Sequence, residues 1–350
     1  MIPSMQKSLR PLADPMRCAL CADSEACAAL GKADDEGVRS YISFIHNLLA
    51  KDGPDPQDYD PIVEGFAQLV ERLQGCSSTQ LHVCRIREAF GAALGPNTMQ
   101  GFALHKPHGY PGDFEIIDRI YTNHVSSQPS LRKWDVFFHS QAAAQAVRNR
   151  KEYFHHVVHE LLDRHHSQKS TILNVASGPA RDVLEFFQKC PQADVEIHCV
   201  ETDIRAIEHA RSLCSGFLDR IVFHNVNAFR FKCDAKFDLV WSAGLFDYLP
   251  DSLFRRLTRH LLSFVRADGE LIIGNFGPAN RMQPYMEVLG EWKLHHRDEG
   301  SLLALAANCG APPGCARVGS EHCGVNLFLH LSPGDAAAWH HTERALGTEE

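Results

Sequence analysis

Long apolar runs and basic clusters are both missing from this sequence of 350 residues. No stretch reaches the roughly eighteen apolar residues of a membrane span, and the N-terminus lacks the basic-then-apolar order of a signal peptide. The formal net charge is −8, and without a basic run a nucleic-acid partner is disfavoured, because phosphate binding needs clustered Lys and Arg. We therefore expect a cytosolic protein that acts on a small molecule, with neither membrane nor nucleic acid as partner.

Complete metal-binding motifs are also missing, although the sequence has 12 cysteines and 21 histidines. Cys18 and Cys21, with Cys27 nearby, have the spacing of half a zinc site, but no second Cys-x-x-Cys or His-x-x-x-His follows within the usual distance. His155 and His159 lie one helical turn apart, yet no carboxylate completes a motif around them. We expect no metal, and reduced cysteines that serve mostly as small apolar side chains.

Helical periodicity dominates the first 165 residues. Apolar residues recur at helical spacing within 38–49 and 62–73, and further helices are predicted at 79–94 and 141–165. The Gly- and Pro-rich stretch His105–Asp113 lies between these helices and cannot be helical throughout. The sequence predicts an N-terminal helical domain, residues 1–165, with a cap or substrate-binding role.

Short apolar runs alternate with helices after Ser170. Strands are predicted at 171–176, 195–201, 221–225, 237–242 and 270–275. This alternation is typical of a parallel sheet covered by helices on both faces. Two more extended segments within 310–331 would close the sheet as a hairpin-like pair. We expect an α/β domain over 166–333, followed by a tail at 334–350.

The first two strand ends have features of a nucleotide-binding sheet. The first strand leads through a turn of small residues, 176–180, into a helix that begins near Arg181, where free backbone N–H groups can meet an anion. Glu201 ends the second strand, at the place where such sheets hold an acid against ribose hydroxyls. Asp203 is better explained as the N-cap of the following helix.

The third and fourth strand ends complete a recognisable series. Asn227 and Phe229 offer an amide and a ring face suited to adenine. The fourth strand, Phe-Asp-Leu-Val-Trp-Ser at 237–242, is followed by Ala-Gly-Leu-Phe-Asp-Tyr at 243–248, a helix, and Asp-Gly-Glu at 268–270. This succession resembles the motif series of class I S-adenosylmethionine-dependent methyltransferases over residues 170–333.

The resemblance implies a Rossmann-like sheet, mostly parallel with a C-terminal antiparallel strand, that binds S-adenosylmethionine for methyl transfer. The family's first motif has an acid and three glycines; Asn174, Ala176, Gly178 and Ala180 stand at those places here, so one glycine is kept. The cofactor-binding residues implied by the resemblance are Asn174, Ala176, Ser177, Gly178, Glu201, Thr202, Asn227, Ala228, Phe229, Ser242, Ala243 and Gly244.

Two other segments are similar to bacterial methyltransferases that form 3-hydroxy fatty acid methyl esters. They are Lys-Pro-His-Gly-Tyr-Pro-Gly-Asp-Phe-Glu at 106–115 and Met-Glu-Val-Leu-Gly-Glu-Trp-Lys-Leu-His-His-Arg at 286–297. This resemblance implies a carboxylic acid as the acceptor, whose two oxygens the guanidinium fork of Arg297 can bind. We expect 105–115 to cap the active site, with Tyr110 and Asp113 in contact with cofactor or acceptor.

Other candidate residues have open roles. Phe246, Tyr248 and Tyr285 are candidate substrate contacts, whereas Trp292 is better explained as a core residue. A carboxylate acceptor is already ionised at neutral pH, but a hydroxyl acceptor needs a base. The candidates for that base are His105, His108, Asp113 and Asp247.

Two other functions fit parts of the pattern. A nicotinamide oxidoreductase would share the sheet and the ribose acid, but Gly-x-Gly-x-x-Gly is absent and Pro179 removes a donor amide from the turn. A non-catalytic reading makes the helical half a partner-binding module beside a degenerate first motif. Methyl transfer to a small-molecule oxygen, either carboxylate or hydroxyl, accounts for more of the sequence.

Overall fold

The computed structural model describes residues 32–74, 78–165, 168–312 and 314–333, and the chain divides into two compact units. The helical unit contains the described residues up to Gln145 together with Arg281–Lys293. The sheet unit contains the described residues of Ala146–Asn280 and those from Leu294 onward. A segment from the C-terminal half of the sequence therefore belongs to the helical unit.

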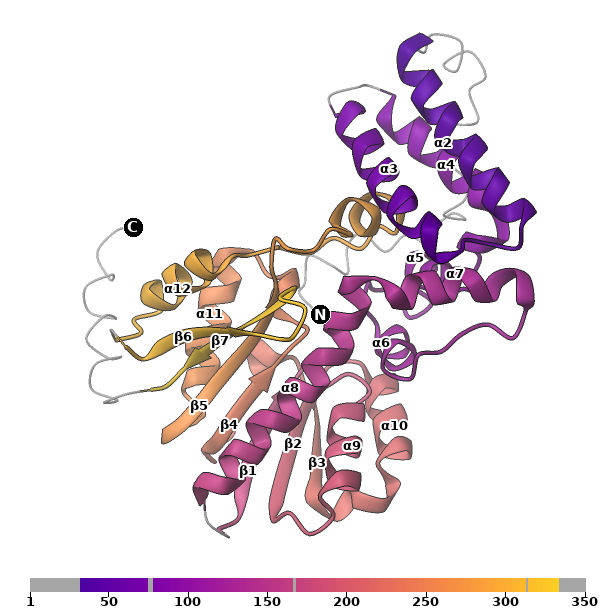
Figure 1. Ribbon diagram of the computed structural model, residues 1–350. Coiled ribbons are helices and arrows are strands. Elements are labelled where there is room, and N and C mark those ends of the chain that lie inside the picture. Colours follow the sequence, from indigo (N-terminus) through magenta and orange to yellow (C-terminus); the bar gives the residue numbers. More distant parts are fainter. Residues whose placement is uncertain (1–31, 75–77, 166–167, 313, 334–350) are drawn as a thin grey trace. The chain divides into compact units, whose positions relative to one another are not determined.

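Seven strands form one sheet in the sheet unit, in the order β3-β2-β1-β4-β5-β7-β6 (Figure 1). The pairs among β1 to β5 are parallel, and β7 is antiparallel to both β5 and β6. The strands are β1 (Ser170–Val175), β2 (Val195–Glu201), β3 (Ile221–Asn225), β4 (Phe237–Ser242), β5 (Val265–Phe276), β6 (Ala316–Ser320) and β7 (Asn326–Leu331). The predicted fold class is confirmed. The strand order changes direction between β1 and β4, where open α/β sheets bind their ligands.

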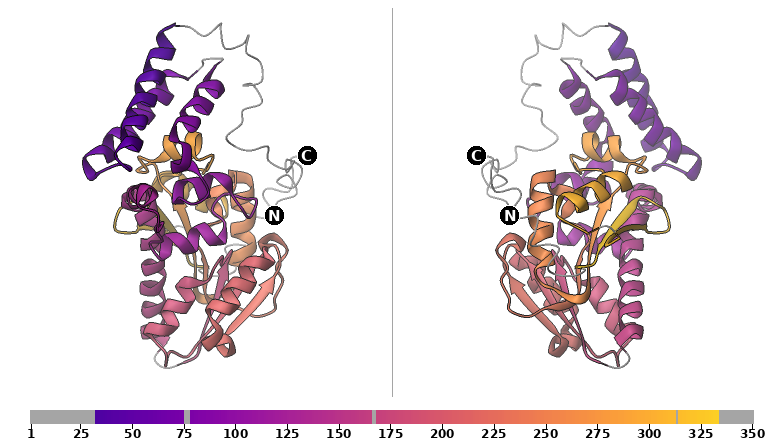
Figure 2. Two further views of the ribbon diagram at one scale, coloured as in Figure 1. Left: turned by 90° about the vertical axis from the view of Figure 1, so that its right-hand side faces the viewer. Right: turned by 90° about the vertical axis from the view of Figure 1, so that its left-hand side faces the viewer.

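Helices cover both faces of this sheet. They are α8 (Ala142–His165), α9 (Arg181–Lys189), α10 (Ile204–Leu213), α11 (Asp251–Leu262) and α12 (Glu299–Asn308). On one face, Phe154 of α8 and Phe186 of α9 share a buried cluster with Ile197 and Trp241 of the strands. α11 packs on β5 and against α12, and in the turned views of Figure 2 α8 and α11 lie on opposite sides of the strands. Cover on both faces explains why every residue of β4 is buried.

The fifth strand begins earlier than the sequence predicts. β5 starts at Val265, and its register with β4 shifts between Phe237 and Leu239, which marks an irregularity in the pairing. Gly269 lies at this irregularity, where a Cβ would come within 2.8 Å of the Asp238 carbonyl oxygen. The Asp-Gly pair therefore permits a bulge inside the strand rather than a turn before it.

Six α-helices of the described residues pack together in the helical unit. They are α2 (Lys32–Ala50), α3 (Tyr59–Arg72), α4 (Thr79–Phe90), α5 (Met99–His105), α6 (Phe114–Tyr121) and α7 (Pro129–Ser140). The π-helical turn Tyr285–Leu289 lies among them. The Tyr285 ring makes edge contacts with Phe66, Phe90 and Phe137, and its hydroxyl donates to Gln100 Oε1 at 2.8 Å. Within the described residues, no helix combines the length and apolar content needed to cross a membrane.

Arg87 of α4 fastens the inserted segment. Its Nε donates to the Leu289 carbonyl at 3.0 Å, its Nη2 to the Val288 carbonyl at 2.7 Å, and its Nη1 to Glu291 Oε1 at 2.7 Å. The side chain is buried, with 3% of the residue exposed. These bonds satisfy carbonyls of the π-turn that its own backbone leaves without donors.

The two units differ from the expected domain boundaries in two places. α8 from Ala146 onward belongs to the sheet unit, because its apolar stripe is buried against the strands. Arg281–Lys293 belongs to the helical unit, because Tyr285 and Arg87 tie it to the helical core. Trp292 in this segment is buried, as predicted.

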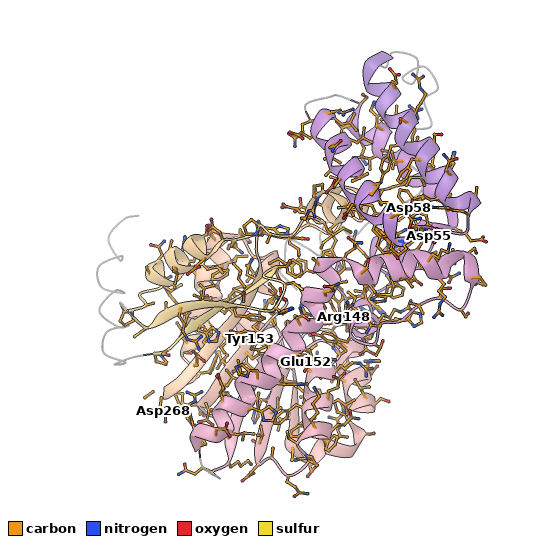
Figure 3. The ribbon with its side chains drawn as sticks, in the orientation of Figure 1. Asp55, Asp58, Arg148, Glu152, Tyr153 and Asp268 are labelled. Carbon is orange, nitrogen blue, oxygen red and sulfur yellow. The ribbon has the colours of Figure 1, made fainter. Side chains whose placement is uncertain are left out.

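A hydrogen-bonded chain joins α8 to the far strands of the sheet. Tyr153, labelled on α8 in Figure 3, lies with its hydroxyl 2.7 Å from His330 Nε2, and His330 Nδ1 is 3.0 Å from Glu270 Oε1. The Tyr153 ring stacks on Phe328 with centroids 3.9 Å apart. These contacts fix the first half of α8 over β5 and β7.

Candidate active site

The turn between β1 and α9 has three residues in left-handed backbone conformations. Ala176 has φ of 56°, Gly178 of 53° and Ala180 of 53°. Glycine is favoured at such positions because it has no Cβ. The two alanines therefore preserve the backbone shape of a glycine-rich turn. A Cβ added at Gly178 would meet no protein atom within 4 Å, so this part of the turn borders open space.

Glu201 connects the end of β2 to this turn. Its Oε2 accepts from Gly178 N–H at 3.1 Å, and its Oε1 accepts from Thr202 and Asp203 N–H at 2.7 and 2.9 Å. Burial raises the pKa of the carboxyl, and these backbone donors oppose that rise. Asp203 caps α10 by accepting from Arg205 N–H, as the sequence predicts.

The ends of β3 and β4 lie at the same edge of the parallel sheet. Asn227 Oδ1 accepts from Phe229 N–H at 2.9 Å, which holds the turn Ala228–Arg230. Ser242 Oγ donates to the Val175 carbonyl at 3.1 Å and so ties β4 to β1. Since β3, β2, β1 and β4 are neighbours in this order, the predicted cofactor residues line one continuous edge.

Arg150 of α8 is a charged residue at this edge that the sequence analysis missed. Its Nη1 donates to the Ala243 carbonyl at 2.9 Å, and a Cβ at Gly244 would lie 3.2 Å from it. Arg150 stabilises the charged forms of Asp182 and Asp247, whose pKa values burial raises. A signal existed: Arg150 and Lys151 fall on the apolar stripe of α8, between Val147 and Phe154, where apolar residues were expected.

Asn174 pairs with an acid that the motif series does not include. Asn174 Nδ2 donates to Asp182 Oδ2 at 3.3 Å, and Asp182 Oδ1 accepts from Val183 N–H at 3.0 Å. The Asp182 carboxyl is buried at the start of α9. These hydrogen bonds join the end of β1 to the first turn of α9.

The segment after β4 contains the buried Asp247. Its Oδ1 accepts from Phe276 N–H at 2.6 Å, which joins the loop to the end of β5. Burial raises the pKa of Asp247 to about 6, against the opposing effects of the Phe276 N–H, Arg150 and Arg297. Of the candidate substrate residues here, Phe246 is fully buried against Phe254, and Tyr248 is half-buried.

Arg297 is held by protein oxygens in the sheet unit. Its guanidinium donates to the Phe246 and Leu249 carbonyls, at 3.3 and 2.6 Å, and to Asn275 Oδ1 at 2.9 Å. It also pairs with Asp251 Oδ1 at 2.8 Å. With 6% of the residue exposed, Arg297 fastens the loop after β4 to the end of β5.

The candidate site residues in the Gly- and Pro-rich stretch, 105–113, lie in the helical unit. Asp113 caps α6, where its Oδ1 accepts from Glu115 and Ile116 N–H at 3.0 and 2.9 Å. His108 Nε2 is 2.8 Å from Glu115 Oε2, and Tyr110 is half-buried. Burial raises the pKa of Asp113. Tyr285, the third substrate candidate, belongs to the core of this unit.

Histidines and cysteines do not gather into a metal site in the parts of the chain that the structure describes. His155 Nε2 donates to the Asp182 carbonyl at 2.8 Å, whereas His159 Nε2 is 3.6 Å from Cys190 Sγ. The two imidazoles thus have separate partners. Cys18, Cys21 and Cys27 lie outside the described residues.

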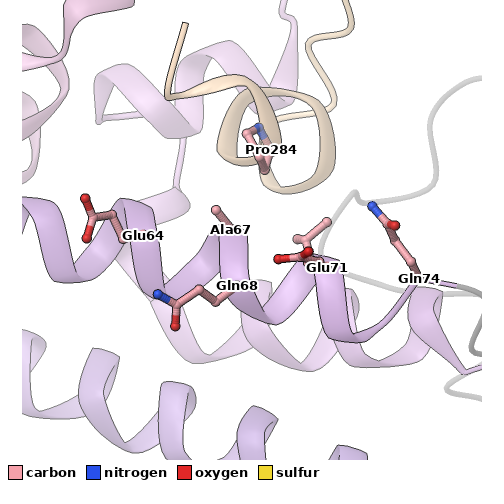
Figure 4. A pocket seen from close by; sticks show the side chains of 7 residues that line it. Glu64, Ala67, Gln68, Glu71, Gln74 and Pro284 are labelled. Carbon is pink, nitrogen blue, oxygen red and sulfur yellow. The ribbon is translucent and has the colours of Figure 1, made fainter. Parts of the chain in front are cut away.

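A hollow of about 450 Å³ lies on the helical unit (Figure 4). The side chains that line it are those of Glu64, Ala67, Gln68, Val70, Glu71, Gln74 and Pro284. Glu64, Gln68 and Glu71 of α3 contribute carboxylate and amide groups to this lining. It contains none of the predicted cofactor or acceptor residues.

Residues 172–269 match the family model of a methyltransferase domain. This range begins in β1 and ends in β5, so it spans all four strand ends with predicted cofactor residues. The chain therefore carries a methyltransferase domain, and the expected enzyme class and its methyl donor, S-adenosylmethionine, are confirmed.

One solved structure shows the same fold, and other solved structures are similar to part of the chain. A possible exported protein from Bordetella parapertussis superposes with a TM-score of 0.57 at 16% identity, over 86% of this chain and 96% of that one. The magnesium protoporphyrin IX methyltransferase of Synechocystis PCC 6803 with bound SAH gives 0.44 at 12% identity, over 61% and 92%. The Burkholderia thailandensis 1,6-didemethyltoxoflavin-N1-methyltransferase gives 0.40 at 15% identity, over 55% and 85%. No curated protein matches the chain in sequence.

Proposed function

We propose that this chain transfers a methyl group from S-adenosylmethionine to an oxygen atom of a small-molecule acceptor. The observation that carries the proposal is the hydrogen bond from Gly178 N–H to Glu201 Oε2. It joins the left-handed turn after β1 to the acid that ends β2, beside the switch point of the sheet. A methyltransferase domain spans both residues.

The residues at this edge fit S-adenosylmethionine in chemical type. Glu201 offers carboxylate oxygens to ribose hydroxyls, and Asn227 with Phe229 offers an amide and a ring face to adenine. The turn at 176–180 offers a backbone without bulky side chains to the methionine portion. Arg150 supplies positive charge beside Ala243 and Gly244. The bound cofactor supplies an electrophilic methyl group on sulfur.

Alignment is the main task of the protein in such a displacement. Holding the acceptor oxygen in line with the methyl carbon and sulfur can contribute on the order of 7–11 kcal/mol. The contacts of Arg297 support a positioning role, because its donors hold the loop after β4 against β5. Tyr110 and Asp113 stay candidate contacts to cofactor or acceptor on the chemistry of their segment, together with Phe246, Tyr248 and Tyr285.

A long-chain 3-hydroxy fatty acid is the acceptor we propose to test first, because of the sequence segments at 106–115 and 286–297. Its carboxylate needs no base, whereas its hydroxyl would need one such as Asp247 or His108. Incubation with methyl-labelled S-adenosylmethionine, followed by mass spectrometry, distinguishes an alkali-labile methyl ester from a stable ether. An ether as the sole labelled product would replace the carboxylate by the hydroxyl as nucleophile.

Calorimetry with S-adenosylhomocysteine tests the cofactor site. We expect Glu201→Ala to weaken binding by roughly 2–4 kcal/mol, because two charge-assisted hydrogen bonds are lost. Glu208→Ala, on the exposed face of α10, is the matched control. Gly178→Val should abolish binding, since its side chain would occupy the open space beside the turn. Unchanged affinity in both folded variants, or binding of NAD in place of S-adenosylhomocysteine, would contradict the proposal.

A further inference from the structure

The outer side of α11 carries a basic surface together with the chain that precedes β4. Its members, called here the α11 basic surface, are Arg230, Lys232, Lys236, Arg255, Arg256 and Arg259. All are exposed except Arg255, which is half-buried. This surface belongs entirely to the sheet unit.

Three contacts place the two segments side by side. The Arg256 guanidinium lies 5.7 Å from the Phe229 ring centroid, and His260 Nε2 donates to the Phe231 carbonyl at 3.0 Å. Lys236 Nζ donates to the Ser263 carbonyl after the end of α11. Because these contacts follow one another along α11, residues 229–236 run beside the helix and their cations join those of α11 on one surface.

The positive charges of this surface outnumber the carboxylates beside them. In the described part of the chain, none of the six cations forms an ion pair with a carboxylate. Two nearby acids have other partners, since Asp238 pairs with Arg266 and Asp251 with Arg297. Asp234, in the same segment, offsets one positive charge. A concentrated positive surface therefore stands on a protein whose net charge is −8.

We propose that the α11 basic surface docks a negatively charged face of a partner protein. Arg255 and Arg259 lie one helical turn apart, and guanidinium groups can bind carboxylates with two hydrogen bonds each. An acidic helix with carboxylates at the same spacing offers a complementary row. Charge complementarity of this kind accelerates encounter and fixes the orientation of the partner.

The observations favour a protein over a membrane or a nucleic acid. Membrane-surface binding by basic segments uses exposed apolar side chains, and the large exposed ones among the described residues, Val136, Ile204 and Val222, lie outside this surface. A long nucleic acid would extend beyond the surface toward an acidic remainder, within the roughly 10 Å reach of electrostatic forces. A partner protein with a compact acidic face needs no exposed apolar side chains here and does not extend toward the acidic remainder of the protein.

Fluorescence anisotropy on the full chain tests the proposal with a labelled helical peptide that carries glutamates four residues apart. We expect saturable binding at about 25 mM salt that weakens at least tenfold at about 300 mM. Lys232→Glu with Arg259→Glu should weaken binding at least tenfold, because one cation is reversed on each segment. The control pair, Arg72→Glu with Arg132→Glu on exposed sites of the helical unit, changes net charge equally and should alter affinity less than twofold.

Further measurements separate docking from unfolding and from other partners. S-adenosylhomocysteine affinity and circular dichroism report the integrity of each variant, and Lys232→Gln with Arg259→Gln gives a milder test. A peptide with lysines in place of glutamates should not bind. Failure of the glutamate peptide to bind, equal loss in the control pair, or tighter binding of a DNA duplex or phosphatidylglycerol vesicles through these residues would overturn the proposal.

Discussion

Ala176 and Ala180 both adopt left-handed backbone conformations, yet their surroundings differ. Ala176 is partly exposed, whereas Ala180 is fully buried in the core. Replacing Ala176 by glycine removes the strain of a Cβ at φ of 56°, so we expect a gain in stability of about 0.5–1 kcal/mol. At Ala180 the same change also removes a buried methyl group, which costs about 0.8 kcal/mol and offsets the gain.

Urea unfolding of both variants measures the difference. A loss of stability in Ala176→Gly would show that the left-handed conformation costs alanine nothing at this turn. The sequence predicted a tight turn here from its small residues, but it could not predict which of them would need positive φ, since alanine rarely adopts it.

The raised pKa of Asp247 leads to a prediction about how the stability of the fold depends on pH. Its pKa is raised to about 6 in the folded chain, above the roughly 3.9 of an unfolded aspartate. The folded state therefore binds this proton more tightly, and the contribution to stability falls as pH rises from about 4 to about 6 and stays low above that. Asp247→Asn keeps an oxygen that accepts from Phe276 N–H but removes the buried charge.

We expect Asp247→Asn to be more stable than the natural chain at pH 8, by an amount on the order of 2–3 kcal/mol, and to show little difference at pH 4. Chemical denaturation at the two pH values checks this. The opposite trend, with the variant losing stability at pH 8, would mean that Arg150 and Arg297 outweigh burial and keep the carboxylate charged.

At the scale of elements, helices and strands could be predicted where apolar residues recur with a clear period along the sequence. The helices α2, α3 and α8 and the strands β2, β3 and β4 follow clear periods, and their predicted positions agree with the structure. β7 lies within the range 310–331, where two extended segments were predicted. α5, α6 and α7 were not predicted. For α5 and α6 the reason is that they are only two turns long and lie on either side of the Gly- and Pro-rich stretch. Their capping by Thr98 and Asp113 was a local signal that could have identified α5 and α6.

The fastening of the inserted segment by Arg87 predicts a large effect of one substitution. Arg87→Ala leaves the buried Val288 and Leu289 carbonyls without donors and breaks the pair with Glu291, so we expect a loss of roughly 2–4 kcal/mol. Arg72→Ala, at an exposed position of α3, is the control and should stay within about 0.5 kcal/mol. Thermal unfolding measures both. If Arg87→Ala were as stable as Arg72→Ala, the apolar residues of 281–293 alone would anchor this segment.

At the scale of the whole molecule, the alternation of strands and helices after Ser170 was enough to predict the α/β sheet, because parallel strands buried on both faces leave a strong apolar signal. The division into units was not predictable from the same signal. Arg281–Lys293 follows β5 closely in sequence, and its packing against Phe66, Phe90 and Phe137 and its hydrogen bonds to Arg87 assign it to the helical unit.

This connectivity predicts that the helical unit cannot fold from the N-terminal part of the chain alone. A fragment of residues 32–145 lacks Tyr285, Leu289 and Trp292, which are buried in the intact chain. Burial of each such side chain contributes roughly 1.5–3 kcal/mol, and their sum is comparable to the 5–15 kcal/mol stability of an ordinary domain. We therefore expect the fragment to lack a cooperative thermal transition.

Fusing residues 281–293 to that fragment through a flexible Gly-Ser linker should restore cooperative unfolding. The linker only has to connect the two segments, which the residues of the sheet unit connect in the intact chain. The matched control is the same fusion with Arg87→Ala and Tyr285→Ala, which removes the charged anchor and the aromatic one together. Circular dichroism during heating compares the three proteins. If the fragment 32–145 unfolds as cooperatively as the fusion, the helices of the fragment suffice to form the core. Residues 281–293 would then add little to the stability of the helical unit.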